Sequence, residues 1–450
     1  MMQNYKYLQF APFQSMTEWS VTHLLNRDLG FTERYPFVRI GDVIQRNAIL
    51  VTVKDDVSYK QITLKTNGGG AVLRDIKLGK DIKTKKQYLA KEGQFIMSKI
   101  DARNGAFGVV TKELDGAIVT AEFPLFDVDA ERISPVYLSL LSATKPFVEY
   151  AQSCSRGTTN RRRIDLDSFL SQQIPLPSLV EQNEIISEYN TAVKQAEICA
   201  KQADSIDDRV SLYWQKVLGV DSQKEITAPK IGYLEFYPFK YFEKWGYDFI
   251  RKENKNKVNA KYSYVRIVDV CDISSGGTPS RSRNEYYKGN IPWVKTRELK
   301  NEELFDTEEK ITALGLEKSS AKLYPKGSIV VAMYGATIGR TAKLGVQATT
   351  NQACAVLFNI QTLRVSVDYL WQFIQSQTDN LKSMAYGGAQ PNINASIIAN
   401  YNIPLPPLNI QNKIVARINA FRVEQKRLHL RSSELREQAE MQLERKIFNK

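Results

Sequence analysis

Histidine and cysteine are scarce in this sequence, which limits the chemistry that it can perform. Among 450 residues there are only two histidines, His23 and His429. The four cysteines are Cys154, Cys199, Cys271 and Cys354. Because no two of them form a CxxC pair, their spacing indicates neither a zinc knuckle nor a disulfide framework. We therefore expect no metal site and no histidine-dependent catalytic group in this chain.

Long apolar runs are also missing. No run reaches the roughly 18 residues that a membrane-spanning helix needs. The first residues, MMQNYKYLQF, lack the charge-then-apolar order of a signal peptide. We expect a cytoplasmic protein with no membrane partner.

Motifs for cofactor binding and catalysis are lacking as well. No FxGxG-type loop precedes a predicted helix, and no N/D-P-P-Y/F motif occurs. The segments GGG (68–70) and GATIGR (335–340) do not match the spacings that cradle phosphate, so we interpret both as turns. The sequence therefore predicts neither a methyltransferase nor a nuclease active site, and it predicts that this chain binds no cofactor.

Positive charge is what the sequence has in excess. It contains 62 Lys and Arg against 49 Asp and Glu, which gives a formal net charge of +13. Such an excess is typical either of a solubilising surface or of a protein that binds a polyanion such as nucleic acid. Composition alone leaves both interpretations open.

A tandem repeat spans nearly the whole chain. YPFVRIGDV (35–43) returns as YSYVRIVDV (262–270), and KEGQFIMSKI (91–100) returns as PKGSIVVAMY (325–334). QQIPLPSLVEQNEII (172–186) returns as NYNIPLPPLNIQNKIV (400–415), and Trp19 matches Trp245. Landmarks in the same order at a nearly constant offset indicate that the chain arose by duplication.

The first part of each copy is predicted to be a mixed α/β domain. Four runs have the Val, Ile, Phe and Tyr content of buried strands: QFIMSKI (94–100), AIVTAEFPLFDV (117–128), SIVVAMY (328–334) and ACAVLFNI (353–360). Ser134-Pro135 and Ser366 open predicted helices that run toward Ala151 and Ala385, with serine as the N-cap.

The second part of each copy is a long polar segment without proline or internal glycine. Apolar positions recur every three or four residues from Ile185 to Tyr213, and the same phase recurs from Ile414. We interpret this pattern as the seam of a paired coiled coil, the alternative being two unrelated amphipathic surface helices. In the pair, we expect the small residues Ala192, Ala196 and Cys199 to face the large residues Phe421 and Leu428.

Two loops at equivalent places in the repeat carry side chains suited to DNA. The first, SRGTTNRRRID (155–165), offers Arg156, Thr158, Thr159, Asn160, Arg161, Arg162 and Arg163. Arginine forms two hydrogen bonds with guanine O6 and N7 or binds phosphate. Thr and Asn form hydrogen bonds with base edges or with the DNA backbone. The second loop, YGGAQPNINAS (386–396), offers Gln390, Asn392 and Asn394, and such amides read adenine. Two different half-sites require loops of different chemistry, although flexible surface loops remain the alternative for each loop alone.

Other basic segments add to this interpretation. GGTPSRSRNEYYKGNIPWVKTRELK (276–300) interleaves cations with aromatic residues, and its candidate DNA contacts are Arg281, Arg283, Lys295 and Arg297. Tyr334 and Arg340 flank the GATIGR turn, and the same turn of the first copy carries Lys99, Arg103 and Asn104. Ordinary surface charge explains any one of these segments, whereas a DNA-binding surface explains them together.

These motifs resemble those of the specificity subunits of type I restriction–modification enzymes. The resemblance rests on GGTPSR with the IPWV that follows it, on GATIGR and TTNQAC, and on YGGAQPNI leading into IPLPPLNIQNKIV. The first copy is similar more loosely, through KEGQFIMSKI, RGTTNRRRI and IPLPSLVEQ. It has NAILVTVKD (47–55) where the family has a GGTP-like opening, so the resemblance does not indicate which of its loops contact DNA.

The resemblance covers essentially the full chain and implies an α+β fold. Two mixed target recognition domains, 1–177 and 230–406, would be separated by two long antiparallel coiled-coil helices, 178–217 and 409–447, in a pseudo-two-fold tandem duplication. A helix of 40 residues is about 60 Å long, enough to hold two domains about one turn of DNA apart. Since the copies differ, the DNA target should be bipartite and asymmetric.

The resemblance also implies partners for a non-catalytic chain. These are double-stranded DNA, two methyltransferase subunits and a helicase-nuclease restriction subunit, with S-adenosylmethionine, ATP and Mg²⁺ held by the partner subunits. Each IPLP junction would present one partner-binding surface, formed by Ile174 and Leu176 or by Ile403 and Leu405. A stand-alone DNA-binding scaffold or decoy and a solo DNA-modifying enzyme are the alternatives.

Overall fold

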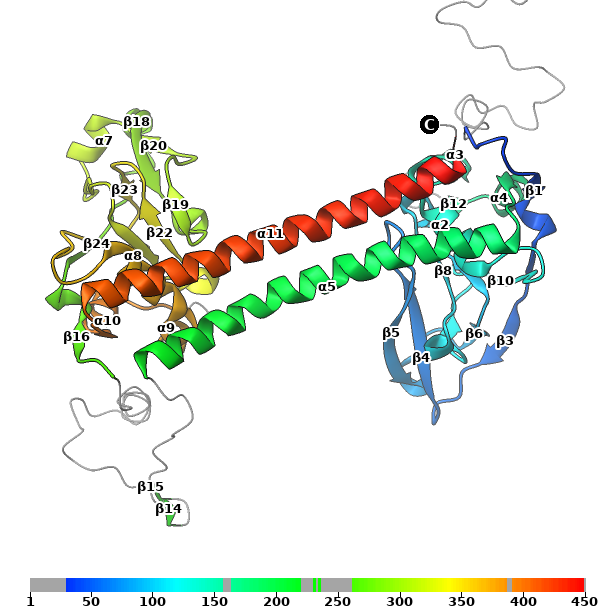
Figure 1. The fold of residues 1–450 in the computed structure, drawn as a ribbon, viewed down its shortest axis with the longest axis horizontal. Helices are drawn as coiled ribbons and strands as arrows, with labels where there is room; N and C mark the ends of the chain where they lie inside the picture. The colour runs from blue at the N-terminus through cyan, green and yellow to red at the C-terminus, as the bar shows by residue number, and fades with distance from the viewer. Residues whose placement is uncertain are drawn as a thin grey trace, which may run out of the picture. The chain divides into compact units, whose positions relative to one another are not determined.

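A computed structural model describes residues 30–156, 163–219, 230–231, 234–235, 261–386 and 391–448 of the chain. The chain divides into two units, Met1–Lys201 with Leu428–Lys450 and Gln202–Arg427. Each unit combines one mixed domain with a part of each of two long helices, α5 (Leu179–Leu218) and α11 (Leu408–Ile447) (Figure 1). Trp19 and Trp245, which extend the repeat, lie outside the described residues.

Two sheets form the first domain. A five-stranded sheet has the order β3-β6-β9-β4-β5, and a four-stranded sheet has the order β2-β10-β7-β8. The strands of the first sheet are β3 (Ile49–Thr52), β6 (Lys86–Leu89), β9 (Ile118–Val119), β4 (Ser58–Leu64) and β5 (Ala71–Leu78). Those of the second are β2 (Ile44–Arg46), β10 (Leu125–Val128), β7 (Phe95–Met97) and β8 (Phe107–Val109). The helices are α2 (Pro135–Ala143), α3 (Lys145–Ser153) and α4 (Leu166–Ser171).

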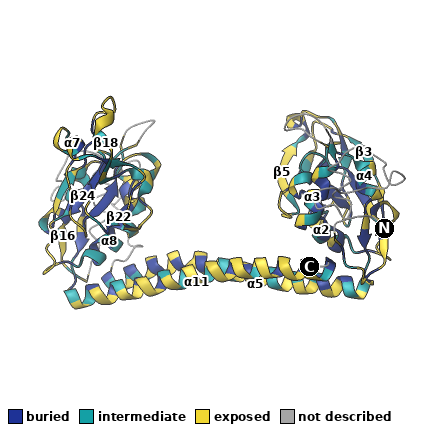
Figure 2. Ribbon diagram, turned by 90° about the horizontal axis from the view of Figure 1, so that it is seen from above, coloured by how far each residue is buried: buried dark blue, intermediate teal, exposed yellow. Residues whose placement is uncertain are grey.

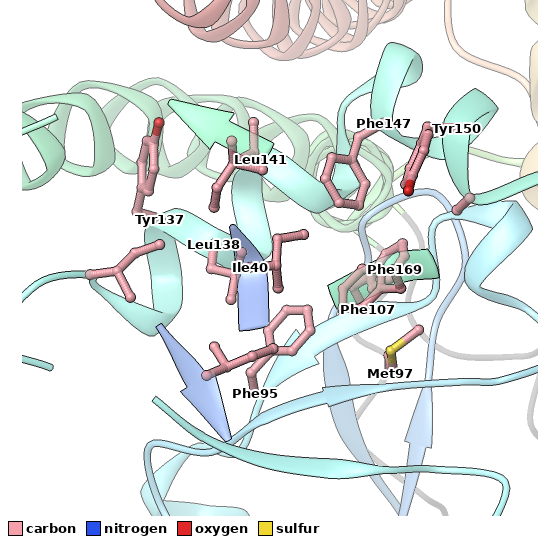
Figure 3. Close-up of a cluster of buried hydrophobic side chains, with 14 of the residues drawn as sticks. Ile40, Phe95, Met97, Phe107, Tyr137, Leu138, Leu141, Phe147, Tyr150 and Phe169 are labelled. Carbon is pink, nitrogen blue, oxygen red and sulfur yellow. The ribbon is translucent and has the colours of Figure 1, made fainter. Parts of the chain in front are cut away.

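Aromatic rings fill the core of the first domain (Figure 3). Phe95 and Phe107, from neighbouring strands, stack on Phe169 of α4 with ring centroids 6.4 and 6.0 Å away. Phe147 of α3 meets Phe169 edge-on at 6.0 Å. Stacked and edge-to-face pairs are the favoured arrangements of such rings. Both faces of β7 are buried, which is why its sequence is a continuous apolar run rather than an alternating one.

The second domain also has two sheets. A five-stranded sheet has the order β17-β24-β21-β22-β19, and a three-stranded sheet has the order β20-β18-β23. The strands of the first sheet are β17 (Asp272–Ser275), β24 (Cys354–Phe358), β21 (Ile329–Ala332), β22 (Thr341–Leu344) and β19 (Glu302–Leu304). Those of the second are β20 (Lys310–Ile311), β18 (Tyr287–Val294) and β23 (Thr349–Thr350). The helices are α7 (Ala313–Glu317), α8 (Val367–Ser376), α9 (Thr378–Ser383) and α10 (Ala395–Ala399).

The landmarks at the two ends of each repeat pair with one another. Strand β1 (Phe37–Arg39) pairs with β13 (Gln173–Pro175), so that Val38 lies opposite Ile174. Strand β16 (Tyr264–Arg266) pairs with β25 (Asn402–Pro404) in the same register. Each IPLP junction therefore closes its own domain immediately before a long helix begins. A further short pair, β14 (Lys230–Ile231) with β15 (Leu234–Glu235), lies between the copies.

The predicted strands and helices occur, with shorter bounds. The run 117–128 is interrupted at Thr120–Pro124 and gives two strands, β9 and β10. The helices predicted after Ser134 and Ser366 begin there, but each divides in two, into α2 and α3 or α8 and α9. Ser134 and Ser366 occupy the predicted N-cap positions, but neither side chain makes a capping hydrogen bond.

A buried glutamine binds the backbone at the start of each of these helices. The backbone N–H of Ser134 donates to Oε1 of Gln182, in the first turn of α5, at 2.7 Å. The amide of Gln182 also donates to the carbonyls of Arg132 and Pro177, at 3.0 and 2.9 Å. In the second copy Gln411 makes the same three bonds, to Ser366, Arg364 and Pro406. Each glutamine thereby fastens the start of a long helix to its domain.

We expect Gln182→Ala and Gln411→Ala each to lower the free energy of unfolding by about 2–4 kcal/mol. Both side chains are fully buried, and buried backbone groups left without a partner cost about 1–3 kcal/mol apiece. Urea unfolding followed by circular dichroism measures the change. Gln202→Ala, at an exposed position of α5, is the matched control and should change stability by less than about 0.5 kcal/mol. Equal effects of all three substitutions would contradict this account.

The two long helices pack antiparallel in each unit. In the first unit, Lys446 pairs with Glu188 at 2.6 Å, and the Ser432 hydroxyl donates to the Ala196 carbonyl at 2.8 Å. In the second unit, Arg209 pairs with Glu424 at 3.0 Å. Residues with higher numbers on α5 contact residues with lower numbers on α11. The predicted antiparallel fold is therefore confirmed. Buried and exposed positions alternate along both helices, as expected for a seam (Figure 2).

Some of the residues that face one another across the seam differ from those predicted. Ala196 faces Ser432, and Phe421 packs edge-on against Tyr213 with ring centroids 5.9 Å apart. The prediction paired positions that are equivalent in the repeat, such as Ala192 and Phe421. In an antiparallel pair, equivalent positions away from the centre lie far apart along the helix axis, so Ala192 and Phe421 cannot touch. Cys199 and Leu428 lie near the centre, between the Ala196–Ser432 and Ala203–Gln425 contacts, and their contact stays a prediction.

Candidate nucleic-acid interface

The arginine-rich loop of the first domain is held closed at its base. Strands β11 (Ser155–Arg156) and β12 (Arg163–Ile164) pair, so the two ends of the loop lie side by side. Gly157–Arg162 lies outside the described residues, and with it the predicted contacts Thr158, Thr159, Asn160, Arg161 and Arg162. The N–H of Ile164 donates to the carbonyl of Lys99 at 2.8 Å, which joins this loop to the preceding turn.

That turn carries the other predicted contacts of the first domain. Ala102–Asn104 forms a short 3-10 helix that ends at Gly105, whose φ is +76°. The Arg103 carbonyl accepts from Gln152 of α3 at 2.9 Å, and the Asn104 carbonyl accepts from the N–H of Asn67 at 2.8 Å. The GGG segment after Asn67 is a turn, as predicted, and packs against this one. Lys99, Arg103 and Asn104 are therefore brought beside the base of the arginine loop.

A carboxylate that the sequence did not reveal binds one of the arginines. Arg163 forms a two-pronged ion pair with Glu122, through Nε and Nη2, each at 3.0 Å. The hydrogen bond from Arg163 holds the pKa of Glu122 below its ordinary range. Arg163 is therefore anchored at the base of the loop, and its contact with DNA stays a prediction. Glu122 interrupts an apolar run just before Pro124, which was the one signal available.

The second domain places its amide loop in the same way. Tyr334 bridges to Asn392, and Tyr386 and Asn392 exchange backbone hydrogen bonds of 3.0 and 2.9 Å. The N–H of Ile393 donates to the carbonyl of Met333 at 2.9 Å, matching the link between Ile164 and Lys99. Asn392 thus lies beside Tyr334, whereas Gln390 lies outside the described residues.

Two further residues of this region have clear positions. Asn394 accepts a hydrogen bond from the N–H of Ile397 at 2.9 Å and so caps α10. Arg340 is exposed at the end of the GATIGR turn, where Gly335–Thr337 is a short 3-10 helix. The tyrosine, the arginine and the amide loop therefore all lie at this turn. In both copies, a loop and a turn that are far apart in the sequence therefore meet at equivalent places.

The cations of the segment 276–300 are bound within the domain. Arg281 lies over the rings of Tyr287 and Trp293, 4.5 and 4.9 Å from their centroids, and pairs with Glu309 at 2.9 Å. Lys295 also binds Glu309, and only 15% of its side chain is exposed. These contacts make both cations parts of an aromatic–carboxylate cluster.

The other two cations of this segment have acidic partners as well. Arg283 pairs with Glu285 at 3.5 Å, and Arg297 pairs with Glu308. Within the described residues, no hydrogen bond or ion pair joins Arg283 or Arg297 to the Tyr334 turn. DNA contact by all four cations of the segment stays a prediction, and each would exchange a carboxylate for a phosphate.

We expect Glu309→Gln to lower the melting temperature at pH 7 by about 2 °C, since the ion pairs are partly screened by solvent. The bonds from Lys295 and Arg281 hold the pKa of Glu309 below its ordinary value of 4.5. A lowered pKa means that the stabilisation is present above pH 4.5 and is lost as the pH falls further. Thermal melts at several pH values should show a constant difference above pH 5.5 that shrinks below pH 4.5. Glu317→Gln, which removes an exposed pair with Lys318, is the control. A difference that grows in acid would contradict the cluster.

The predicted partner-binding residues lie inside the junctions. Ile174 and Ile403 are fully buried in the short sheets that close each domain. Leu176 and Leu405 are half-buried, and their backbone N–H groups donate to Pro36 and Ser263 at 2.8 and 2.9 Å. Partner binding by these four residues stays a prediction, and the buried two could act only through the shape of the junction.

The described residues contain no cluster of three or more His, Cys, Asp or Glu side chains that could hold a metal ion. None of the helices in the described ranges is both long enough and apolar enough to cross a membrane. The thiols of Cys154, Cys271 and Cys354 are buried, and burial raises the pKa of Cys271 to about 12. Such a thiol stays protonated at neutral pH and is a poor nucleophile.

Comparisons with known proteins agree on one family. The profile of the Type I restriction modification DNA specificity domain matches residues 259–431, which lie within the second copy. The Type I restriction enzyme HindI specificity subunit of Haemophilus influenzae is 23% identical over 380 residues, covering 75% of this chain and 83% of that protein. The MjaVIII specificity subunit of Methanocaldococcus jannaschii is 20% identical over 402 residues, covering 86% of each chain.

Solved structures share the fold. A chain from work on complex assembly and conformational transition of the type I R-M system superimposes with a TM-score of 0.62 at 18% identity, covering 92% of this chain and 98% of that chain. The HsdS subunit from Thermoanaerobacter tengcongensis superimposes with a TM-score of 0.50 at 17% identity, covering 93% and 97%. The fold is that of two β-sheet domains whose long helices pack together.

Residues 259–431 belong to the family of type I restriction modification DNA specificity domains, and the chain as a whole is similar to the specificity subunits of type I restriction–modification systems. It is the DNA specificity subunit, a non-catalytic part of such a complex.

Proposed function

We propose that this chain reads a bipartite, asymmetric DNA target, one half with each domain. The observation that carries the proposal is that both copies contain the same arrangement of a loop and a turn, but with different side chains. In both copies a loop that follows the domain's helices is hydrogen-bonded to a turn that carries exposed polar side chains. The first copy supplies arginines, and the second supplies amides and a tyrosine.

The chemistry of each loop suits different bases. Arginine forms a two-pronged contact with guanine, whereas Asn and Gln form one with adenine. The backbone of Asn392 is fixed by the bridges to Tyr334 and Tyr386, which positions this part of the loop before DNA arrives. Arg163 is fixed in a comparable way by Glu122. Side chains held in advance lose less conformational entropy on binding.

The chain would act within a larger assembly. Each IPLP junction continues directly into a long helix, and the duplication repeats this surface once in each copy. An identical methyltransferase subunit could therefore bind at each junction, and a helicase-nuclease restriction subunit would join for cleavage. S-adenosylmethionine, ATP and Mg²⁺ would be bound by these partners, and the assembly would work in the cytoplasm, where the DNA is.

Reconstitution with the cognate methyltransferase tests the proposal. The complex should transfer methyl groups to a defined bipartite site, and its affinity for that site should exceed its affinity for unrelated duplex by about 10³-fold or more. This chain alone should transfer none. Equal binding to all duplexes would contradict sequence reading, and methyl transfer by the purified chain would contradict the non-catalytic role.

A further inference from the structure

The excess positive charge of the chain is concentrated in one part of the first domain. Residues 44–91 contain eleven Lys and Arg and only four Asp and Glu. The corresponding residues of the second copy, 271–325, contain nine of each. More than half of the net charge of +13 therefore lies in one segment, whose counterpart in the repeat is neutral. A uniformly solubilising surface would not be divided in this way.

The middle of the charged segment is a two-stranded ribbon, β4 with β5, which is joined to the candidate DNA-reading turn. Strands β4 and β5 pair along their whole length and are connected by the GGG turn. At this end of the ribbon, the N–H groups of Asn67 and Gly68 donate to the carbonyls of Asn104 and Gly105 at 2.8 and 3.2 Å. The ribbon then runs away from α2 (Figure 1). Its strand β5 is an edge strand with exposed Arg74 and Lys77.

Two interlocked loops, 53–57 and 79–86, lie at the other end of the ribbon, and we call them the lysine loops. The N–H of Lys80 donates to the carbonyl of Asp55 at 3.1 Å, and the N–H of Val53 donates to that of Lys85 at 2.8 Å. A Cβ at Gly79 would lie 1.9 Å from the carbonyl oxygen of Lys54, so only glycine allows this approach.

Most of the lysines in these loops have no acidic partner. Lys85 is the exception, since it pairs with Asp55 at 2.6 Å. The others are exposed and form no ion pair within the described part of the chain: Lys54, Lys80, Lys83 and Lys86. In the second domain, by contrast, Arg281, Lys295 and Arg297 all have carboxylate partners. The lysine loops therefore keep their charge available for a separate polyanion.

We propose that the β4–β5 ribbon and the lysine loops form a sequence-independent surface for DNA phosphates, which the second domain lacks. This inference rests on the proposed function, because the ribbon is fastened to the turn that carries Arg103 and Asn104. Seven residues of strand span about 23 Å. Phosphates recur about every 3.4 Å along each strand of DNA, so the ribbon covers about six or seven base pairs. A duplex held at the turn would then also reach the lysine loops.

The triple variant Lys80→Ala, Lys83→Ala, Lys86→Ala tests the proposal in the complete methyltransferase complex. Each phosphate contact contributes about 0.9 to the slope of log K against log salt concentration. We expect the triple variant to lower that slope by about two to three. Affinity for target and unrelated duplex should fall by the same factor, so that their ratio stays as in the unchanged complex. The triple Lys→Arg variant at these positions should retain the original slope.

A charge-matched control uses Lys318 and Lys322 of the neutral counterpart segment and Lys326, which directly follows it, all three of them exposed. Alanine at these three positions should leave the slope unchanged. An unchanged slope in the Lys80, Lys83 and Lys86 variant would overturn the proposal. So would an equal fall in the control, because net charge alone would then be responsible. The slope is measurable on any duplex, so failure of sequence reading would appear separately, as a target-to-unrelated ratio of about one.

Discussion

Alanine at Arg161, Arg162 and Arg163 is expected to relax or abolish recognition of one half of the DNA target while the other half is still read. Arg163 lies at the described base of the loop, and the other two belong to the part outside the described residues. Each lost two-pronged contact with a base costs about 1–3 kcal/mol of discrimination, so loss of several should lower specificity by at least tenfold. Binding to a panel of duplexes with single mismatches in either half measures the effect.

Alanine at Gln390 and Asn392 should affect the other half. Asn392 is held beside Tyr334 by backbone bonds that the substitution leaves intact, so the loop should keep its position. The two variants serve as controls for each other, because each should tolerate mismatches only in its own half-site. If both degrade recognition of the same half equally, the assignment of one domain to one half-site is wrong.

The second large effect concerns assembly. One copy of this chain should recruit two copies of a methyltransferase subunit, because the duplication repeats each junction and its helix once. Isologous or equivalent surfaces bind identical partners, so a site that occurs twice is filled twice. Native mass spectrometry of the co-expressed complex measures the ratio, and we expect one to two.

The rival assembly is a homodimer formed through the long helices. The seam within one chain opposes it, since Ala196, Phe421 and Ser432 are already buried against the other helix of the same chain. A two-to-two complex held together by α5 and α11 would contradict the account. A one-to-one complex would show that the two junctions are not equivalent.

Large-scale features were accessible from the sequence because they repeat. The copies VRIGDV and VRIVDV, and the two IPLP junctions, locate the strands that pair to close each domain. The three-and-four spacing from Ile185 predicts a seam, and Ile185, Ala196, Ala203 and Ile206 are buried in it. Periodicity is a local property, so one sequence suffices to recognise it.

Pairings between distant residues were not accessible. Glu122 and Arg163 are far apart in the sequence, and so are Glu309 and Arg281, and only the folded chain brings each pair together. The carboxylate and aromatic partners of Arg281 and Lys295 were therefore not predicted, and the contact of both residues with DNA stays a prediction. Some of the facing residues of the seam, such as Ala192 and Phe421, were mispredicted for the same reason, since register depends on how the two helices meet.

The buried glutamines show a third limit. Gln182 and Gln411 occur at the same place in both copies, yet a polar residue in a helix's first turn is usually exposed. Their function depends on three backbone groups that converge only after the domain has closed. Repetition of a polar residue at equivalent positions was the available signal.

Methylome sequencing of cells that carry this chain with its methyltransferase tests the central claim most directly. Two unlike recognition domains in one chain predict a motif of two different specific halves separated by unspecified bases, methylated on opposite strands. The Arg161, Arg162 and Arg163 variant should change one half of that motif and leave the other half as it was. A continuous or palindromic motif, or one that both loop variants change in the same half, would contradict the account.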